Sequence, residues 1–178
     1  MHLTTLFVFI LFSVAATAQQ DTAKTALTVQ PPKELADTLA PYQKYTGIPT
    51  FSIQLPDSTW FFNTDLEKKK PVLILYFSPE CGHCQLELEH IIGKMNELNK
   101  LQIVMITSRS FQDMSDFCLR YKTNKFPAIT IGRDPAYNIT RFYKVEFTPF
   151  SALYNKRGKL VKVYRTGIDL EELVKLVN

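Results

Sequence analysis

Hydrophobic residues along this chain fall into two recurring patterns, and each pattern predicts one type of element. Short apolar runs bounded by turn-forming residues predict strands, which we place at 50–55, 59–62, 72–77, 101–107, 126–131, 150–154 and 160–164. Apolar residues three and four positions apart predict helices, which we place at 84–99, 111–121, 137–143 and from Asp169 to the last residue. Strands that alternate with helices, followed by a terminal hairpin and helix, predict an α/β sandwich with a mixed sheet.

The first 45 residues are organised differently. A short apolar core at Leu6–Phe12 and the small residues Ala16–Ala18 are typical of a secretory signal peptide at 1–18, too short for a membrane span. No Lys or Arg precedes that core, so a retained N-terminal anchor is the alternative. Residues 19–45 are polar and broken by prolines, which predicts a flexible segment with a short helix near 33–39. One domain at 46–178 follows, expected outside the cytoplasm in the periplasm or cell envelope.

Charge and cysteine content narrow the classes of function. The net charge of +4 is spread along the chain, and its single basic triplet, Lys68–Lys70, fits a solvated turn, so we expect no nucleic-acid partner. Three cysteines in an exported chain indicate one pair and one leftover thiol. The leftover Cys118 shares a helical face with Met114 and Tyr121, which predicts a buried thiol; a second redox site is the alternative.

The pair is Cys81 and Cys84, separated by Gly82 and His83. It lies between a predicted strand and a predicted helix, the context in which this spacing indicates thiol–disulfide exchange. Cys84 continues the apolar stripe of that helix, whereas Cys81 comes one turn earlier. We therefore expect Cys81 to be the exposed attacking sulfur and Cys84 the shielded resolving sulfur. A static disulfide or half of a zinc site is the alternative, but the chain offers few further ligands, and we expect no metal and no cofactor.

Three side chains near the pair are expected to influence it. His83 can donate a hydrogen bond or carry positive charge, although any exposed loop histidine would look the same. Glu80 opposes thiolate formation by its like charge. Glu87 follows Cys84 by three residues, and its carboxylate could move a proton to or from the resolving thiol or could be a solvated helix acid.

Thr148-Pro149 is a second candidate element of the site. A proline that follows a cis bond beside the cysteines would leave neighbouring backbone groups free to pair with an extended substrate. An ordinary proline at the start of a strand is the alternative.

These residues together resemble the thioredoxin superfamily, specifically exported proteins of the TlpA/ResA type, over about 48–178. The resemblance rests on the N-terminal hairpin, the run from Tyr76 to Cys84, the Thr148-Pro149 element and a strand and helix inserted before it at 126–143. It implies a thioredoxin-like three-layer sandwich, a cis Pro149, an active-site role for Glu87 and activity as a reductant or isomerase. Two departures stand out. The acid that thioredoxins carry on the central strand is replaced by Leu75, and the Gly-His pair resembles protein disulfide isomerases.

The expected partners are protein disulfides or thiols, together with an upstream membrane redox donor. Two other functions remain open. A thiol peroxidase could use Ser78, three residues before Cys81, to assist a peroxide-reacting thiolate. A copper-carrying redoxin could bind Cu(I) through Cys81, Cys84 and His83.

Overall fold

The computed structural model describes residues 39–178, so the predicted signal peptide and all but the last residue of the predicted helix near 33–39 lie outside the described residues. The helices are α2 (Pro41–Lys44), α3 (Gly82–Gly93), α4 (Phe111–Tyr121), α5 (Asn138–Tyr143) and α6 (Leu170–Val177), with 3₁₀ turns η1 (Asn63–Asp65) and η2 (Thr123–Lys125). The strands are β1 (Ser52–Gln54), β2 (Trp60–Phe62), β3 (Val72–Tyr76), β4 (Gln102–Thr107), β5 (Ile129–Arg133), β6 (Phe150–Tyr154) and β7 (Leu160–Tyr164).

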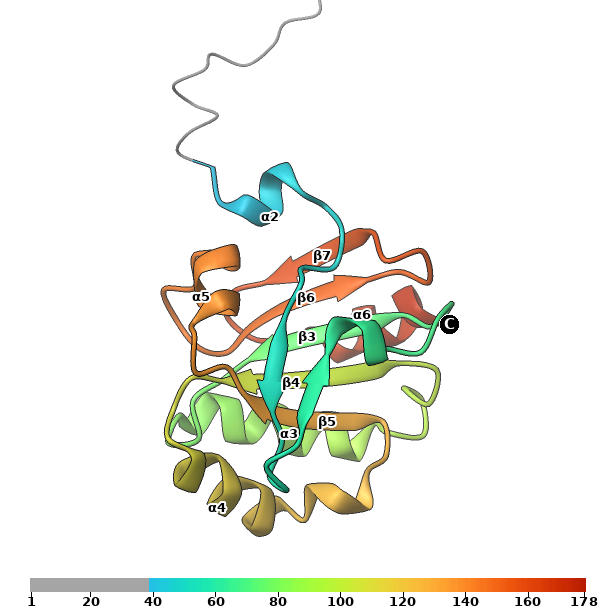
Figure 1. Cartoon of the computed structure of the whole chain (residues 1–178). Coiled ribbons are helices and arrows are strands. Elements are labelled where there is room, and N and C mark those ends of the chain that lie inside the picture. The colour runs from blue at the N-terminus through green and yellow to red at the C-terminus, as the bar shows by residue number, and fades with distance from the viewer. Residues whose placement is uncertain (1–38) are drawn as a thin grey trace, which may run out of the picture.

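The strands form one mixed seven-stranded sheet in the order β2-β1-β5-β4-β3-β6-β7 (Figure 1). β3 lies inside the sheet next to the central strand β4, parallel to β4 and antiparallel to β6. β4 is buried at all of its positions, as expected for a strand covered on both faces. β1 and β2 form the predicted N-terminal hairpin, and β6 and β7 form the predicted terminal one.

Helices cover both faces of the sheet and produce three layers. The core on one face contains residues of α3, α4 and α6, among them Leu88, Phe117 and Leu173. The core on the other face contains Tyr42 of α2 and Tyr143 of α5. The predicted three-layer mixed α/β fold is confirmed. Within residues 39–178, no helix is long and apolar enough to cross a membrane.

Two predicted boundaries are wrong. The helix after the cysteine motif ends at Gly93 and does not continue to residue 99; turns follow it, and the Lys94 N–H turns back to the carbonyls at the end of the helix. Glycine is a poor helix former, and this position is where the helix stops. The strand predicted to start at residue 126 starts at Ile129, because η2 and Pro127 hold the preceding residues in turns and proline cannot donate to a strand ladder.

Candidate active site

The cysteine motif joins β3 to α3. After β3, the Phe77 N–H still bonds to the Ile106 carbonyl of β4 at 3.0 Å, and the Cys81 N–H bonds to the Ser78 carbonyl at 3.0 Å. Cys81 is the N-cap of α3, and its Sγ accepts the Cys84 N–H at 3.4 Å. A helix start exposes N–H groups that have no partner within the helix, so an anionic sulfur at this position is stabilised. Both thiols are free in this structure.

The two sulfurs lie in different environments. Cys81 is partly exposed, whereas Cys84 is fully buried. Burial, together with the hydrogen bond to Cys81, raises the pKa of Cys84 to about 12. Burial also acts to raise the pKa of Cys81, but hydrogen bonds from the Cys84 thiol, the Thr148 side chain and the N–H groups of Cys84 and His83 together lower it below its ordinary value. Cys81 is therefore the sulfur that ionises first.

The Thr148-Pro149 segment lies against Cys81. The thiol of Cys81 donates to the Thr148 carbonyl at 3.6 Å, a long contact acceptable for sulfur. The peptide bond between Thr148 and Pro149 is cis. Pro149 itself is buried, whereas Phe147 is 76% exposed. The fold thus brings together two elements that are 67 residues apart in sequence.

Glu80 is paired, and sequence reasoning missed its partner. The Ser78 hydroxyl donates to the Glu80 carboxylate at 2.6 Å, and this bond is the main reason that the pKa of Glu80 lies below its ordinary value. Arg109, from the segment between β4 and α4, lies 3.4 Å from the same carboxylate and also donates to Ser78 at 3.2 Å. Nothing in the spacing of Arg109 marks it, because it follows Ser78 by 31 residues and only the sheet brings the two together.

Glu87 is buried, so the interpretation of it as a solvated helix acid is wrong. Both of its carboxylate oxygens accept the Ile168 N–H, at 3.0 and 3.2 Å. Gly167 makes this contact close: its φ of +123° favours glycine, and an added Cβ would lie 3.2 Å from Glu87 Oε2. Burial raises the pKa of Glu87, and the bond from Ile168 only partly offsets this effect. Through this hydrogen bond, the Glu87 carboxylate connects the segment before α6 to α3.

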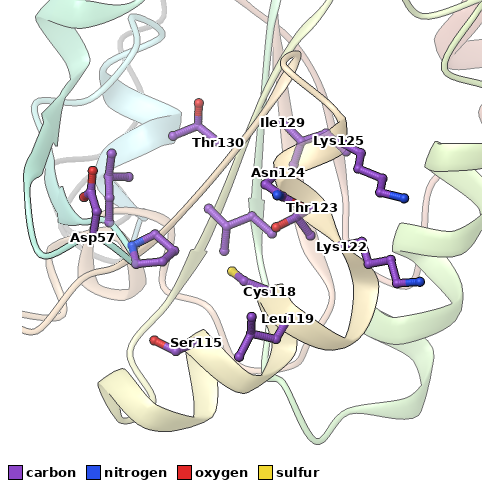
Figure 2. A pocket seen from close by; sticks show the side chains of 13 residues that line it. Asp57, Ser115, Cys118, Leu119, Lys122, Thr123, Asn124, Lys125, Ile129 and Thr130 are labelled. Carbon is purple, nitrogen blue, oxygen red and sulfur yellow. The ribbon is translucent and has the colours of Figure 1, made fainter.

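His83 and Cys118 take positions that the sequence did not specify. His83 is exposed, and its effect on the Cys81 pKa comes from its backbone N–H. Cys118 is only half-buried and lines a cavity to which neither Cys81 nor Cys84 contributes (Figure 2). The expected buried thiol is therefore only partly buried: Cys118 packs against the core, and its burial is enough to raise the pKa of its thiol. Leu75, at the position of the absent acid, is fully buried in the core.

Metal-binding donors are sparse in the described chain. No group of three or more His, Cys, Asp or Glu side chains in residues 39–178 is placed to hold a metal ion.

Comparison with known proteins agrees with the fold. The thioredoxin family model matches residues 52–143. A secreted Mycobacterium tuberculosis disulfide oxidoreductase, homologous to Escherichia coli DsbE, has a similar structure (TM-score 0.60, 21% identity, 71% of this chain and 93% of that one). The pneumococcal exposed lipoprotein thioredoxin Etrx1 is similar too (TM-score 0.58, 20% identity, 72% and 98%), as is a thiol peroxidase from Chromobacterium violaceum (TM-score 0.59, 15% identity, 73% and 82%). No curated protein sequence matches the chain.

Proposed function

The chain belongs to the thioredoxin family and is an oxidoreductase, and we propose that it exchanges disulfides with protein partners outside the cytoplasm through Cys81 and Cys84. The observation that carries this proposal is the asymmetry of the pair. One sulfur caps a helix, is partly exposed and has a lowered pKa; the other is buried behind it with a pKa of about 12.

This asymmetry supports an order of steps. The thiolate of Cys81 attacks a sulfur of the partner disulfide, and the partner's second sulfur leaves as a thiolate that takes up a proton. Cys84 then loses its proton, attacks Cys81 Sγ and releases the partner. Two electrons have passed from the Cys81–Cys84 dithiol to the partner, and a disulfide remains between the two cysteines. An upstream reductant, which we place in the membrane, restores the dithiol.

Deprotonation of the Cys84 thiol is the unfavourable step of this reaction, because the pKa of that thiol is high. Cys84 and Glu87 lie one helical turn apart, and both are buried. A raised pKa makes the Glu87 carboxylate a stronger base than an ordinary carboxylate. We propose that Glu87 takes this proton while its bond from Ile168 holds it in place.

Two features support a location outside the cytoplasm. Residues 1–18 have the composition of a signal peptide. Two of the similar structures belong to proteins described as secreted or as an exposed lipoprotein. The periplasm or cell envelope is the compartment in which such a chain would meet protein disulfides.

The peroxidase alternative has weaker support. Its sequence basis was the hydroxyl of Ser78, but that hydroxyl donates its proton to Glu80 at 2.6 Å. The two functions separate in one assay. The reduced protein, supplied with dithiothreitol, should reduce insulin disulfides over many turnovers and should consume hydrogen peroxide no faster than a Cys81→Ser variant. Rapid peroxide consumption that depends on Cys81, with no insulin reduction, would contradict the proposal.

A further inference from the structure

A groove lies between α4, η2, β5 and the turn that joins β1 to β2 (Figure 2). Its volume is about 810 Å³, within the range of ligand-binding clefts. The turn contributes Leu55–Asp57, α4 contributes Ser115, Cys118 and Leu119, η2 contributes Thr123 with its neighbours, and β5 contributes Ile129–Ile131. It is separate from the cysteine pair, which lines none of it.

The groove exists because β1 leaves β5 after a single pair of residues. Gln54 pairs with Arg133, and Gly132 allows this approach, since an added Cβ would lie 2.7 Å from Ile53 Cδ1. The next residues of β1 cannot extend the ladder. Pro56 has no N–H to donate. The Leu55 N–H already donates to the Thr59 carbonyl, across the turn between β1 and β2, at 2.8 Å. At its other residues β5 is paired with β4 only.

The unpaired edge of β5 carries hydrogen-bonding groups that face the groove. Ile103 of β4 is opposite Ile129 and donates to the Ala128 carbonyl at 2.8 Å. In a parallel ladder, alternate residues direct their backbone groups to the same side. Ala128 and Thr130 therefore direct theirs to β4, and Ile131 directs its N–H and C=O to the opposite side.

No backbone hydrogen bond joins Ile131 to residues 55–57 of the described chain. Unpaired N–H and C=O groups on a strand edge, as at Ile131, are a template for another strand. Ile131 is only 4% exposed, so this edge lies within the groove and not on the open surface. An unpaired strand edge is the surface on which extended peptides bind in known strand-addition complexes.

Side chains complete the site. Ser115 and Cys118 project from α4 into the groove, whereas the ammonium groups of Lys122 and Lys125 point away from it (Figure 2). The Ser115 hydroxyl is buried and has no hydrogen-bond partner among the described residues. Leu119 is 76% exposed at the rim. The groove thus offers an apolar floor, beside which the Ser115 hydroxyl is buried without a partner.

We propose that this groove binds an extended segment of a partner polypeptide, which adds as a strand to β5 at Ile131. One of its side chains, apolar and of moderate size, enters between Leu55 and Cys118. The backbone supplies the affinity and that side chain supplies the selectivity. This site would bind a partner independently of the thiol chemistry at Cys81.

The probe for this proposal is a fluorescein-labelled peptide, Lys-Thr-Val-Thr-Val-Thr-Lys, added to the reduced mature chain. We expect saturable binding by fluorescence anisotropy. In an NMR titration the Ile131 amide should shift and its exchange with solvent should slow, whereas the Thr130 amide, which faces β4, should keep its exchange rate. The control peptide is N-methylated at each Val and Thr. Its affinity should be lower by about tenfold or more, because it loses backbone hydrogen bonds that each contribute about a factor of five.

Two changes in the protein test the location. Ser115→Trp should fill the groove and abolish binding of the peptide, whereas Val161→Trp, on the exposed edge strand β7, should leave binding unchanged. If Ser115→Trp does not fold, a bimane label on Cys118 of a Cys81→Ala/Cys84→Ala variant should block binding in the same way.

Four results would overturn the proposal. The first two are that the unmethylated peptide does not bind saturably, or that the N-methylated peptide binds equally well. The third is that the NMR shifts are confined to β2 or β7. The fourth is that the Ile131 amide is already protected from solvent exchange in the free chain. In the last case, loss of protection on dilution would assign the groove to a second copy. Loss of protection on deletion of residues 19–38 would assign it to the chain's own N-terminal segment.

Discussion

The guanidinium of Arg109 lies 3.4 Å from the carboxylate of Glu80, the residue directly before the attacking cysteine. It also donates to Ser78, whose hydroxyl holds the same carboxylate at 2.6 Å. Glu80 therefore does not act on Cys81 as an isolated negative charge. The cation reduces the like-charge repulsion that the sequence alone predicted.

Replacing Arg109 with Ala should raise the pKa of Cys81, because the charge of Glu80 is then less compensated. The effect should be modest, at most about fivefold in the rate of iodoacetamide alkylation of Cys81 at pH 7, since exposed ion pairs are worth about 0–1 kcal/mol. The rate should be followed from pH 5 to 10. A Glu80→Gln/Arg109→Ala double variant should recover the wild-type pH profile. An unchanged profile in the single variant would show that Arg109 has no electrostatic role.

The His83→Pro substitution removes a backbone N–H that helps to lower the pKa of Cys81. Proline is tolerated in the first turn of a helix, so α3 should persist. Because the Cys81 thiolate loses a donor, the reduced form is destabilised and the pair should become more reducing. One hydrogen bond of about 1 kcal/mol corresponds to a shift of roughly 20 mV.

The control is His83→Ala, which keeps the N–H and should shift the potential by less. Equilibration with glutathione gives both values. An equal shift in the two variants would assign the effect to the imidazole.

Glu87 should make stability depend on pH. Its pKa in the folded state is raised by burial, so the folded state binds the proton more tightly than the unfolded state does. This contribution to stability is fully present below the unfolded pKa, near 4.3. It is lost as pH rises through the folded value. Glu87→Gln keeps an acceptor for Ile168 but cannot ionise.

Urea unfolding from pH 3.5 to 8 should therefore show Glu87→Gln gaining stability relative to the wild type as pH rises. Glu87→Ala should be less stable at every pH, by about 1–3 kcal/mol, because the half-buried Ile168 N–H loses its acceptor. A difference between wild type and Glu87→Gln that does not vary with pH would contradict the raised pKa.

Cys118 should react slowly with alkylating agents. Its thiol is half-buried and its pKa is raised by burial, so little thiolate forms at neutral pH. At pH 7.5 the order of modification in the reduced protein should be Cys81, then Cys118, then the fully buried Cys84. Mass spectrometry of peptides after timed quenching measures this order. Modification of Cys118 ahead of Cys81 would contradict the assigned pKa directions.

The sequence predicted the fold because its apolar patterns are local. The alternation of strands and helices, the two hairpins and the N-cap of α6 at Asp169 all follow from residues close together in the chain. The end of α3 was missed because the apolar stripe continues to Met95, whereas the backbone already turns at Lys94.

Contacts across the fold could not be predicted from pattern. The bond between Glu87 and Ile168 spans 81 residues, and that between Arg109 and Ser78 spans 31. The groove beside β5 depends on where β1 stops pairing, which Pro56 alone does not determine. The motif indicated a pair of thiols, and the tertiary structure supplied the groups that distinguish one from the other.

The most direct test of the division of roles between Cys81 and Cys84 is covalent trapping of a partner protein. The Cys84→Ser variant should accumulate a mixed disulfide between Cys81 and reduced-and-reoxidised insulin or an envelope protein, because the resolving thiol is missing. The Cys81→Ser variant should trap none, since Cys84 is buried and its pKa is about 12. Non-reducing gels followed by mass spectrometry identify the cysteine in each adduct. Adducts on Cys84 in the Cys81→Ser variant, with none in the Cys84→Ser variant, would contradict the account.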